Sequence, residues 1–380
     1  MELVFWISMM LLVYVYIGYP LFVWAIARIV PKPVMSPEAI DASPSVTVVI
    51  AAHNEAGHIE ETVRNKLASE YPADLLNVIV VSDDSSDGTD EIVAGLGERV
   101  RLERQTPRAG KTSALNMAVS LTEAEIVVFS DANSLYAPNA ISELVVRFAD
   151  PNVGYVTGKM VYVGTDGSVA GDGCTAYMRY ENFIRAQESR VGRVIGVDGG
   201  VDAVRRSEYT AMRPDQQPDF VLPLSVLEKR LKVLYAPEAL LKEQALDDTG
   251  SEYRMRVRVS LRALWALWDK RALFNPLRYP GTALQLFSHK VLRYFAFVPL
   301  ALALVANIAL ATGSEFYAML LFGHIGFYAL AAAGTWLHMV PRGVFVTLPA
   351  YFVLINAAAA HAAIKMASGE RMATWTPRTG

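Results

Sequence analysis

Two long apolar stretches at opposite ends constrain this chain more than any other feature. The first runs from Met1 to about Val30 and contains only Glu2 and Arg28 as charged residues. The second runs from about Val291 to Met366 and is broken at ATGSE and VPRG. A membrane helix needs about 20 consecutive apolar residues. We therefore predict a transmembrane anchor at 1–30 and a transmembrane region of about three segments at 288–366, with candidates at 291–312, 316–338 and 343–366.

The first stretch could instead be a cleaved signal peptide. Its apolar core is longer than the roughly 7–15 residues of such peptides, no basic region precedes it, and no small-residue cleavage site follows. A retained anchor is therefore expected. Arg28 and Lys32 lie at the end of this anchor, and Lys290 and Arg293 lie at the start of the second stretch. Because Lys and Arg favour the cytoplasmic side, the central domain is expected to face the cytoplasm, at the cell membrane.

Composition limits the classes of function that remain open. The chain is 53% hydrophobic with a mean hydropathy of +0.26, whereas residues from about 45 to 275 have the mixed composition of a globular domain. The single cysteine, Cys174, cannot form an internal disulfide, which fits a reducing compartment. A net charge of −3 without a basic stripe argues against nucleic acid as the main partner.

Short β-branched runs alternate with helical patterns in the central domain. SVTVVIAAHNE predicts a buried strand, and apolar residues at Ile59, Val63 and Leu67 predict the helix that follows. Further strands are expected at Asn77 to Ser82, in RLERQ and in EAEIVVFSD, with helices from about Thr89 and after PRAGK. This alternation predicts an α/β domain with a mostly parallel, Rossmann-like sheet that helices cover on both faces.

Three predicted strands end in polar clusters, at 53–55 (HNE), 82–84 (SDD) and 130–133 (SDAN). Alone, each is more typical of a helix cap or a solvated turn. Ligands of parallel sheets bind at the carboxyl ends of the strands, so three clusters at that edge indicate a binding site. Acidic side chains suit a ribose, a base edge, or a cation that bridges to phosphate.

The phosphate motifs of other nucleotide enzymes are missing. Neither the Gly-rich dinucleotide fingerprint nor a P-loop follows the first strand. Lys111 stands at a predicted helix start with Arg108 nearby, where the helix dipole favours a phosphate. The alternative is a solvated lysine at a helix start.

The segments AAHNE, VSDDSSDGT, RAGKTSALN, FSDAN and PNAISELVVRFADPNVGYVTG together resemble the processive, membrane-embedded family-two glycosyltransferases. That group includes the cellulose, hyaluronan and poly-N-acetylglucosamine synthases. The resemblance covers about residues 45 to 265. It implies a GT-A fold at 45–252 that binds a nucleotide-sugar, usually a UDP-sugar, with transmembrane helices at both ends.

The resemblance also implies roles for single residues. Asp83 and Asp84 match the acidic pair that contacts the nucleoside, Lys111 the lysine near the nucleotide, and Asp131 the first residue of the metal motif. His53 and Glu55 are assigned to the same donor site. QQPDFVLPLSV resembles the segment with the general base, which points to Asp219, with Asp215 as the competitor. GVDGGVDAVRRS resembles the acceptor-side loop, which would place Gly199, Gly200, Arg205 and Arg206 beside the acceptor.

The sequence departs from the family pattern in two places. Asn133 replaces the second acid of the metal motif, so Asp131 and Asn133 are the candidate ligands of a divalent cation, Mg²⁺ or Mn²⁺. The Gln-X-X-Arg-Trp motif of processive synthases is absent, and EYRMRVRVSLRALWALW stands in its place. There Arg256 and Arg258, beside Arg254, could neutralise the diphosphate. Transfer of one or a few sugars is therefore as compatible with the sequence as polymerisation.

The same arginine-rich segment has an apolar stripe at helical spacing: Val257, Leu261, Leu264, Trp265 and Trp268. Amphipathic helices at the membrane interface are therefore expected at 253–287, in preference to a buried core helix. The basic tail at 367–380 contains Trp375, Pro377 and Arg378, which resemble a tail motif that relatives keep near the cytoplasmic site. This similarity favours a cytoplasmic carboxyl terminus.

Together these features predict an inverting glycosyltransferase that transfers a sugar to a polysaccharide or lipid-linked acceptor at the membrane. A polyprenyl-phosphate monosaccharide transferase is the alternative within enzymes. A transporter or sensor with a regulatory nucleotide-binding domain is the alternative from another class. Few charges lie within the apolar stretches, and this argues against a transporter.

Overall fold

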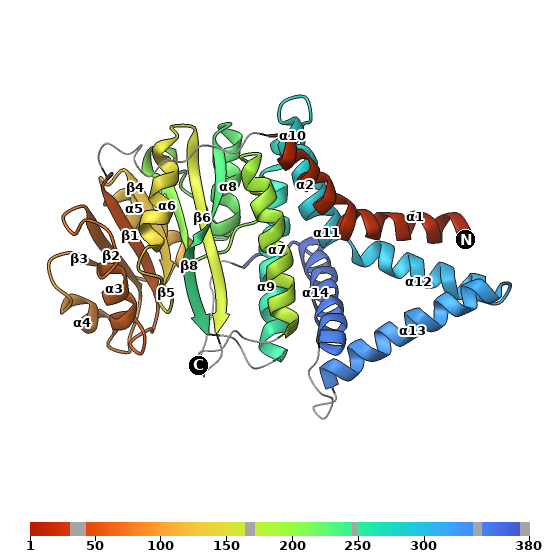
Figure 1. Ribbon diagram of the computed structural model, residues 1–380. Coiled ribbons are helices and arrows are strands. Elements are labelled where there is room, and N and C mark those ends of the chain that lie inside the picture. Colours follow the sequence, from red (N-terminus) through yellow and green to blue (C-terminus); the bar gives the residue numbers. More distant parts are fainter. Residues whose placement is uncertain (31–42, 164–171, 245–248, 337–343, 373–380) are drawn as a thin grey trace. The chain divides into compact units, whose positions relative to one another are not determined.

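The computed structural model describes residues 1–30, 43–163, 172–244, 249–336 and 344–372 (Figure 1). The chain divides into two compact units. The helical unit comprises Met1–Ile29, Gly164–Ile184 and Ala245–Glu370, and the sheet unit comprises Val30–Val163, Arg185–Gln244 and Arg371–Gly380. The sheet unit agrees with most of the domain predicted at 45–252, but the described residues 172–184 group with the helices.

The first half of the sheet is parallel, as the alternation of strands and helices predicts. β1 pairs with β2 on one side and with β4 on the other, and β3 pairs with β2. All seven residues of β1 are buried, which explains its unbroken apolar and β-branched composition. The elements are β1 (Val46–Ala52), α3 (Ile59–Leu67), β2 (Leu76–Asp83), α4 (Thr89–Ala94), β3 (Val100–Gln105), α5 (Lys111–Ser120) and β4 (Ile126–Asp131).

The second half of the sheet is mixed. β7 is antiparallel to β4 and to β6, β6 is parallel to β8, and β5 is antiparallel to β8. The full strand order is β3-β2-β1-β4-β7-β6-β8-β5. The elements are β5 (Leu135–Tyr136), α6 (Ala140–Val145), β6 (Val153–Val163), β7 (Asp202–Arg205), α8 (Pro218–Glu228) and β8 (Lys232–Gln244).

Strand register brings the polar clusters to one edge. Ala51 lies opposite Asp131, Ala52 opposite Ser82, and Asp83 opposite Gln105. Since β1, β2 and β4 are parallel, the residues that follow them meet at the carboxyl edge of the sheet. The predicted convergence of 53–55, 82–84 and 130–133 is confirmed.

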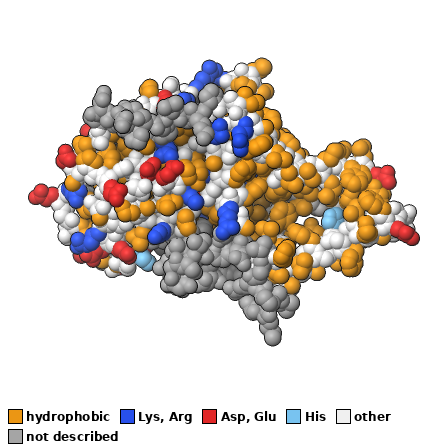
Figure 2. All heavy atoms as spheres, in the orientation of Figure 1, with side chains coloured by type: hydrophobic (Ala, Val, Ile, Leu, Met, Phe, Trp, Pro, Cys, Tyr) orange, Lys and Arg blue, Asp and Glu red, His pale blue; other side chains and the backbone are white. Residues whose placement is uncertain are grey.

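The helical unit contains the apolar stretches. Its first helix is continuous from α1 (Glu2–Val13) through a π-helical turn (Tyr14–Gly18) to α2 (Tyr19–Ile29). Hydrophobic side chains cover most of the visible face of α1, α12 and α13 in Figure 2. The later helices are α9 (Thr249–Asp269), α10 (Pro280–Gln285), a π-helical turn (Leu286–Val291), α11 (Leu292–Tyr294), α12 (Phe297–Ala311), α13 (Glu315–Trp336) and α14 (Val344–Ala367), and α7 (Asp172–Arg190) belongs partly to each unit.

Three helices of the described residues are long and apolar enough to cross a membrane: Glu2–Ile29, Glu315–Gly334 and Phe345–Ala367. The predicted segment at 291–312 differs from a simple span. Pro280–Tyr294 and Phe297–Ala311 form a pair bent by 55°, which is either a broken span or a re-entrant loop. Residues 337–343, where the predicted second and third segments meet, lie outside the described residues.

The apolar stripe of α9 is mostly covered by protein. Val257, Leu261 and Leu264 are buried, and α9 packs against α14, while Trp268 is 56% exposed. The buried part of the stripe therefore stabilises the helical unit and is not itself a membrane-facing surface. Placement of 253–287 at the interface stays a prediction.

We expect the carboxyl terminus to lie in the cytoplasm. If the bent pair enters and leaves on one side, the two spans α13 and α14 return the chain to the side of the sheet unit, and the basic tail favours that side. Trp375, Pro377 and Arg378 of this tail lie outside the described residues. In a Cys174→Ser background, a cysteine added after Gly380 should resist a membrane-impermeant maleimide in intact cells and react after permeabilisation. Labelling of intact cells would place the tail outside.

Candidate active site

Hydrogen bonds connect the loops that follow β1 and β2. The His53 ring donates from Nδ1 to the Asp83 carbonyl at 2.7 Å, and the Ser86 amide donates to Asn54 Oδ1 at 2.9 Å. Glu55 is anchored through its own amide, which donates to Thr89 Oγ1 at 3.0 Å. These contacts fix the first two polar clusters as one surface.

The Glu55 carboxyl group lies near the other acids of this edge. Burial raises its pKa, and the charges of Asp131 and Asp87 raise it further, against His58 at 3.4 Å. The effect of Asp131 shows that the first and third clusters influence each other electrostatically.

Asp83 is a buried carboxylate that shapes the start of α5. It accepts from Gln105 Nε2 at 2.5 Å and from the amides of Ala109 and Gly110 at 2.8 and 2.9 Å. Gly110, the residue before α5, has φ +95°, a conformation that glycine adopts without strain. Asp83 therefore positions Lys111, the first residue of α5.

The structure shows Asp83 as a positioning residue, and its contact with the nucleoside stays a prediction. The Asp83 side chain is 0% exposed, whereas the Asp84 side chain is 38% exposed. Asp84 has φ +62° and lies 3.7 Å from Arg104. Of the acidic pair, Asp84 is the more accessible candidate for direct contact with the donor.

We expect Asp83→Asn to lower the free energy of unfolding by about 1–3 kcal/mol, since an amide nitrogen would face backbone donors in a buried site. Asp84→Asn is the matched control and should change stability by less than about 0.5 kcal/mol, because the side chain is 38% exposed and Asn tolerates positive φ. Urea midpoints from pulse proteolysis measure both. Equal midpoints for the two variants would contradict the positioning role of Asp83.

Lys111 forms an ion pair with Asp131 at the end of β4. Desolvation lowers the pKa of Lys111, but the carboxylates of Asp131, Asp219 and Asp202 outweigh it and leave the pKa raised. Lys111 is therefore a permanent cation among acids, at the amino end of a helix. The solvated-lysine alternative does not describe this arrangement.

Gly199 and Gly200 run closely past the two central carboxylates. A Cβ at Gly199 would lie 3.1 Å from Asp219 Oδ2, and a Cβ at Gly200 would lie 3.2 Å from Asp131 Oδ2. Gly200 also has φ +88°. The two glycines thus permit the backbone to pass between Asp131 and Asp219, and their predicted place beside the site agrees with this geometry.

Asp219 is better suited than Asp215 to take a proton. It lies in the first turn of α8, is half-buried, and accepts from Gln217 Nε2 at 3.1 Å. Asp215 contacts Arg213 at 3.1 Å and also Arg371. Burial raises the pKa of Asp215, but these two arginines outweigh it and lower the pKa below its ordinary value. The structure therefore favours Asp219.

Asp131 and Asn133 form a sparse donor set for a metal. Among the described residues, no group of three His, Cys, Asp or Glu side chains could hold an ion. Asp131 is already paired with Lys111, and Asn133 adds only a neutral carbonyl. Magnesium commonly uses one or two protein carboxylates together with substrate phosphates. The residues fit a cation that is shared with a diphosphate.

Two buried side chains of this site escape sequence reasoning. Asp202 begins β7 and is 2% exposed, and burial raises the pKa of its carboxyl group well above the ordinary value. Lys66 of α3 lies 3.9 Å from the centre of the Tyr136 ring, and burial lowers its pKa to about 7 against the charge of Asp131. The only signal for Lys66 is a lysine on the apolar face of a helix.

The structure corrects the placement of Arg205 and Arg206. β7 is antiparallel to β4, so Asp202 lies opposite Phe129 near the site, while Arg205 lies opposite Ile126 at the other end of β4. At about 3.3 Å per residue, this separates Arg205 from Asp131 by about 16 Å. Arg205 donates to the Phe148 carbonyl at 2.9 Å, and Arg206 contacts Glu123 at 2.9 Å. Both arginines stabilise the far edge of the sheet.

Arg256 and Arg258 lie on α9, in the helical unit. The Arg256 guanidinium donates to Glu252 at 2.7 Å and lies 5.5 Å from the centre of the Tyr351 ring. Their contact with the donor diphosphate stays a prediction.

Comparison with known proteins decides the family. Residues 47–207 match the family model Glycosyl transferase family 2. This region is a glycosyltransferase family 2 domain. The domain contains β1, β2, β4 and the Gly199–Gly200 turn, while Asp219 lies just beyond the matched residues.

The curated relatives of the family 2 domain match over limited lengths. A Beta-monoglucosyldiacylglycerol synthase from Trichormus variabilis is 29% identical over 168 residues, which is 43% of this chain and 36% of that protein. A Poly-beta-1,6-N-acetyl-D-glucosamine synthase from Staphylococcus aureus is 31% identical over 123 residues, 31% of this chain and 29% of that protein. The chain thus spans only about a third of the length of each of these relatives.

A solved structure resembles nearly the whole chain. It is the mannosyltransferase PcManGT from Pyrobaculum calidifontis in complex with GDP-Man and Mn²⁺, with a TM-score of 0.72 and 24% identity, over 95% of this chain and 98% of that one. The likeness shows that the family 2 domain has the predicted GT-A fold.

Proposed function

We propose that this chain is an inverting glycosyltransferase of the cell membrane, with its family 2 domain in the cytoplasm. It moves a sugar from a nucleotide-sugar, a UDP-sugar by family resemblance, to a glycan or lipid-linked acceptor. The observation that carries the proposal is the approach of Asp219 and of the Asp131–Lys111 pair to the Gly199–Gly200 turn. The candidate base Asp219 and the candidate phosphate site at Lys111 and Asp131 thus lie on either side of the Gly199–Gly200 turn.

In the proposed reaction, Asp219 takes the proton of the acceptor hydroxyl while that oxygen attacks the anomeric carbon. The bond between the anomeric carbon and the diphosphate breaks in the same displacement, which inverts the configuration. Lys111 lies at the amino end of α5 and stabilises the negative charge of the leaving nucleoside diphosphate. The half-buried position of Asp219 leaves its carboxylate accessible to an acceptor.

Asp131 and Asn133 are the residues that would hold a divalent cation, Mg²⁺ or Mn²⁺. The cation would neutralise charge on the diphosphate. PcManGT was solved in complex with Mn²⁺ as well as its nucleotide-sugar, and this supports the assignment. Lys111 balances Asp131 in the absence of a cation, which keeps an isolated carboxylate from standing unpaired in the site.

The acceptor class follows from two kinds of support. Three described helices are long and apolar enough to cross a membrane, which supports an acceptor at a membrane. The two named relatives are a Beta-monoglucosyldiacylglycerol synthase and a Poly-beta-1,6-N-acetyl-D-glucosamine synthase, and their names support a lipid and a glycan acceptor respectively. Lipid and glycan acceptors are therefore both compatible with the family 2 domain.

The test is a screen of UDP- and GDP-sugars for release of nucleoside diphosphate by the full chain in nanodiscs, with the mass of the product measured in parallel. We expect release with one sugar nucleotide and dependence on added lipid or glycan. Nucleotide binding without release from any donor would contradict the proposal and favour a sensor.

A further inference from the structure

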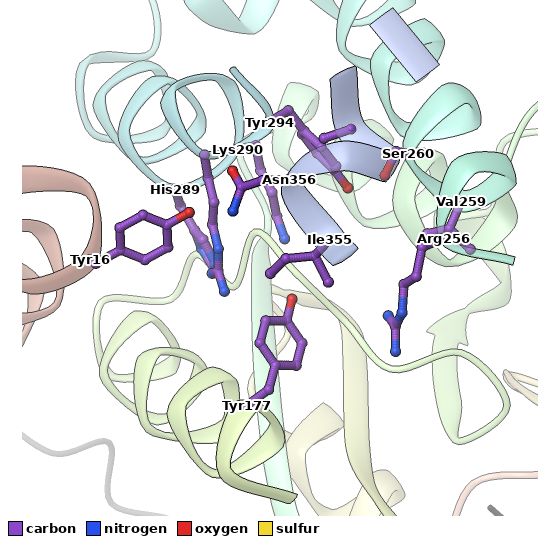
Figure 3. A pocket seen from close by; sticks show the side chains of 12 residues that line it. Tyr16, Tyr177, Arg256, Val259, Ser260, His289, Lys290, Tyr294, Ile355 and Asn356 are labelled. Carbon is purple, nitrogen blue, oxygen red and sulfur yellow. The ribbon is translucent and has the colours of Figure 1, made fainter. Parts of the chain in front are cut away.

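The helical unit contains a cavity of about 110 Å³ whose lining includes several basic side chains (Figure 3). Segments far apart in the sequence meet at its walls. Those that matter here are Tyr16 of the first helix, Tyr177 of α7, Arg256 of α9, Lys290 and Arg293 of the bent pair, and Asn356 of α14.

The charge of the lining favours an anion. Four of the twelve described residues that line the cavity are basic, namely Arg256, His289, Lys290 and Arg293, and none of the twelve is acidic. Figure 3 shows His289 and Lys290 beside Tyr16, with Arg256 on the opposite side. Ionisable groups within membrane helices are costly, and they usually mark a functional site.

Arg293 is held in place by contacts other than those of a ligand. It forms an ion pair with Glu181, and its guanidinium lies 5.3 Å from the centre of the Tyr177 ring and 5.2 Å from that of Tyr180. Burial raises the pKa of Glu181, but Arg293 and His289 outweigh it and keep the carboxylate ionised. Glu181 does not line the cavity. Arg256 is held in a similar way by Glu252 at 2.7 Å, so two of the basic groups of the lining have fixed positions.

The neutral polar groups of the lining also suit an oxyanion. Tyr16, Tyr177, Tyr294 and Ser260 have hydroxyl donors, and Asn356 has an amide. A phosphate group has several strong acceptor oxygens and forms short, charge-assisted hydrogen bonds. The volume is that of a few water molecules at about 30 Å³ each, well below the roughly 300–1,000 Å³ of pockets for whole drug-sized ligands. A phosphate head fits this volume.

The helices around the cavity indicate which kind of molecule would carry the bound phosphate group. Tyr16 belongs to the candidate span Glu2–Ile29, Asn356 to Phe345–Ala367, and Lys290 and Arg293 to the bent pair that begins at Pro280. A lipid in the same bilayer can place its head among these helices while its tails remain in the apolar layer. We propose that the cavity binds the phosphate group of an anionic membrane lipid. This binding is independent of sugar transfer by the family 2 domain.

The test is a calorimetric titration of the full chain in neutral detergent with dihexanoyl phosphatidic acid. Inorganic phosphate and dihexanoylglycerol, which lack the tails and the phosphate respectively, are titrated in parallel. Lys290→Gln and Arg256→Gln should each weaken phosphatidic acid binding by about tenfold, the loss of one charge-assisted hydrogen bond. Arg278→Gln is the matched control, because Arg278 is an exposed arginine of the same unit that does not line the cavity. Arg293 is left intact because its loss would leave Glu181 buried without its cation.

The expected pattern is saturable binding of phosphatidic acid, weak binding of both comparison ligands, and loss only in the two cavity variants. Inorganic phosphate bound as tightly as phosphatidic acid would overturn the lipid as the source. Unchanged affinity in both cavity variants, or equal loss in Arg278→Gln, would overturn the site itself. Thermal melting in detergent monitors folding of each variant. UDP binding, measured in parallel, should be unchanged in Lys290→Gln, because Lys290 lines the cavity and is not assigned to the donor site.

Discussion

Asp219→Asn is expected to lower the rate of sugar transfer by about 10²–10⁴-fold while nucleotide affinity and folding stay normal. The amide has nearly the same size as the carboxylate and can still accept from Gln217, but it cannot take a proton, and a positioned base contributes about this factor. The measurement is initial-rate kinetics with saturating donor, alongside calorimetry of UDP binding.

Asp215→Asn is the matched control for this change, because it removes a second carboxylate from the same stretch of chain. Asp215 is bound by Arg213 and Arg371, so its substitution should act through local packing and leave most of the turnover. Near-normal turnover in Asp219→Asn together with a large loss in Asp215→Asn would exchange the two assignments.

Asp131→Asn is expected to reduce transfer by at least about 10²-fold, since it removes both the partner of Lys111 and the only carboxylate of the candidate metal site. Wild-type protein should bind Mn²⁺ weakly alone and tightly together with UDP, because the phosphates complete a donor set that the protein leaves sparse. Calorimetric titration of Mn²⁺ with and without UDP measures this directly, without reference to turnover.

Asn133→Asp is the opposite change, because it adds a carboxylate to the candidate metal site. A second carboxylate should tighten Mn²⁺ binding in the absence of UDP, as the acid at this place in the family motif implies. Unchanged binding would mean that Asn133 only caps the turn after Asp131. Tight Mn²⁺ binding by the nucleotide-free wild type, or full activity in excess chelator, would show that the cation does not arrive with the donor.

Several elements could be predicted from the sequence because their causes are local. The apolar β-branched run of β1 is buried along its whole length, and Ile59 and Val63 of α3 lie in the core as their spacing predicts. Parallel pairing of β1, β2 and β4 then brings Asp83 and Asp131 to the same edge. For these elements, hydrophobic periodicity and chain connectivity are sufficient to predict the structure.

Other residues could not be placed in this way. Arg205 and Arg206 follow Gly199 and Gly200 closely in sequence, yet β7 reverses direction against β4 and carries them to the far end of the sheet. The direction of a strand depends on its partners, which local sequence does not state. The same reversal leaves Asp202 buried near the site.

The sequence by itself determined the apolar helices at both ends, the α/β alternation, and the types of side chain available at the strand ends. Tertiary structure alone decided what those side chains do. Asp83 was predicted as a ligand contact, but three donors from the chain around residues 105–110 satisfy it internally. Asp219 and Asp131 are 88 residues apart (219 − 131) in sequence, and the Gly199–Gly200 turn passes close to both. The physical reason is that burial, ion pairing and close approach depend on distances in space, and only the folded chain sets those distances.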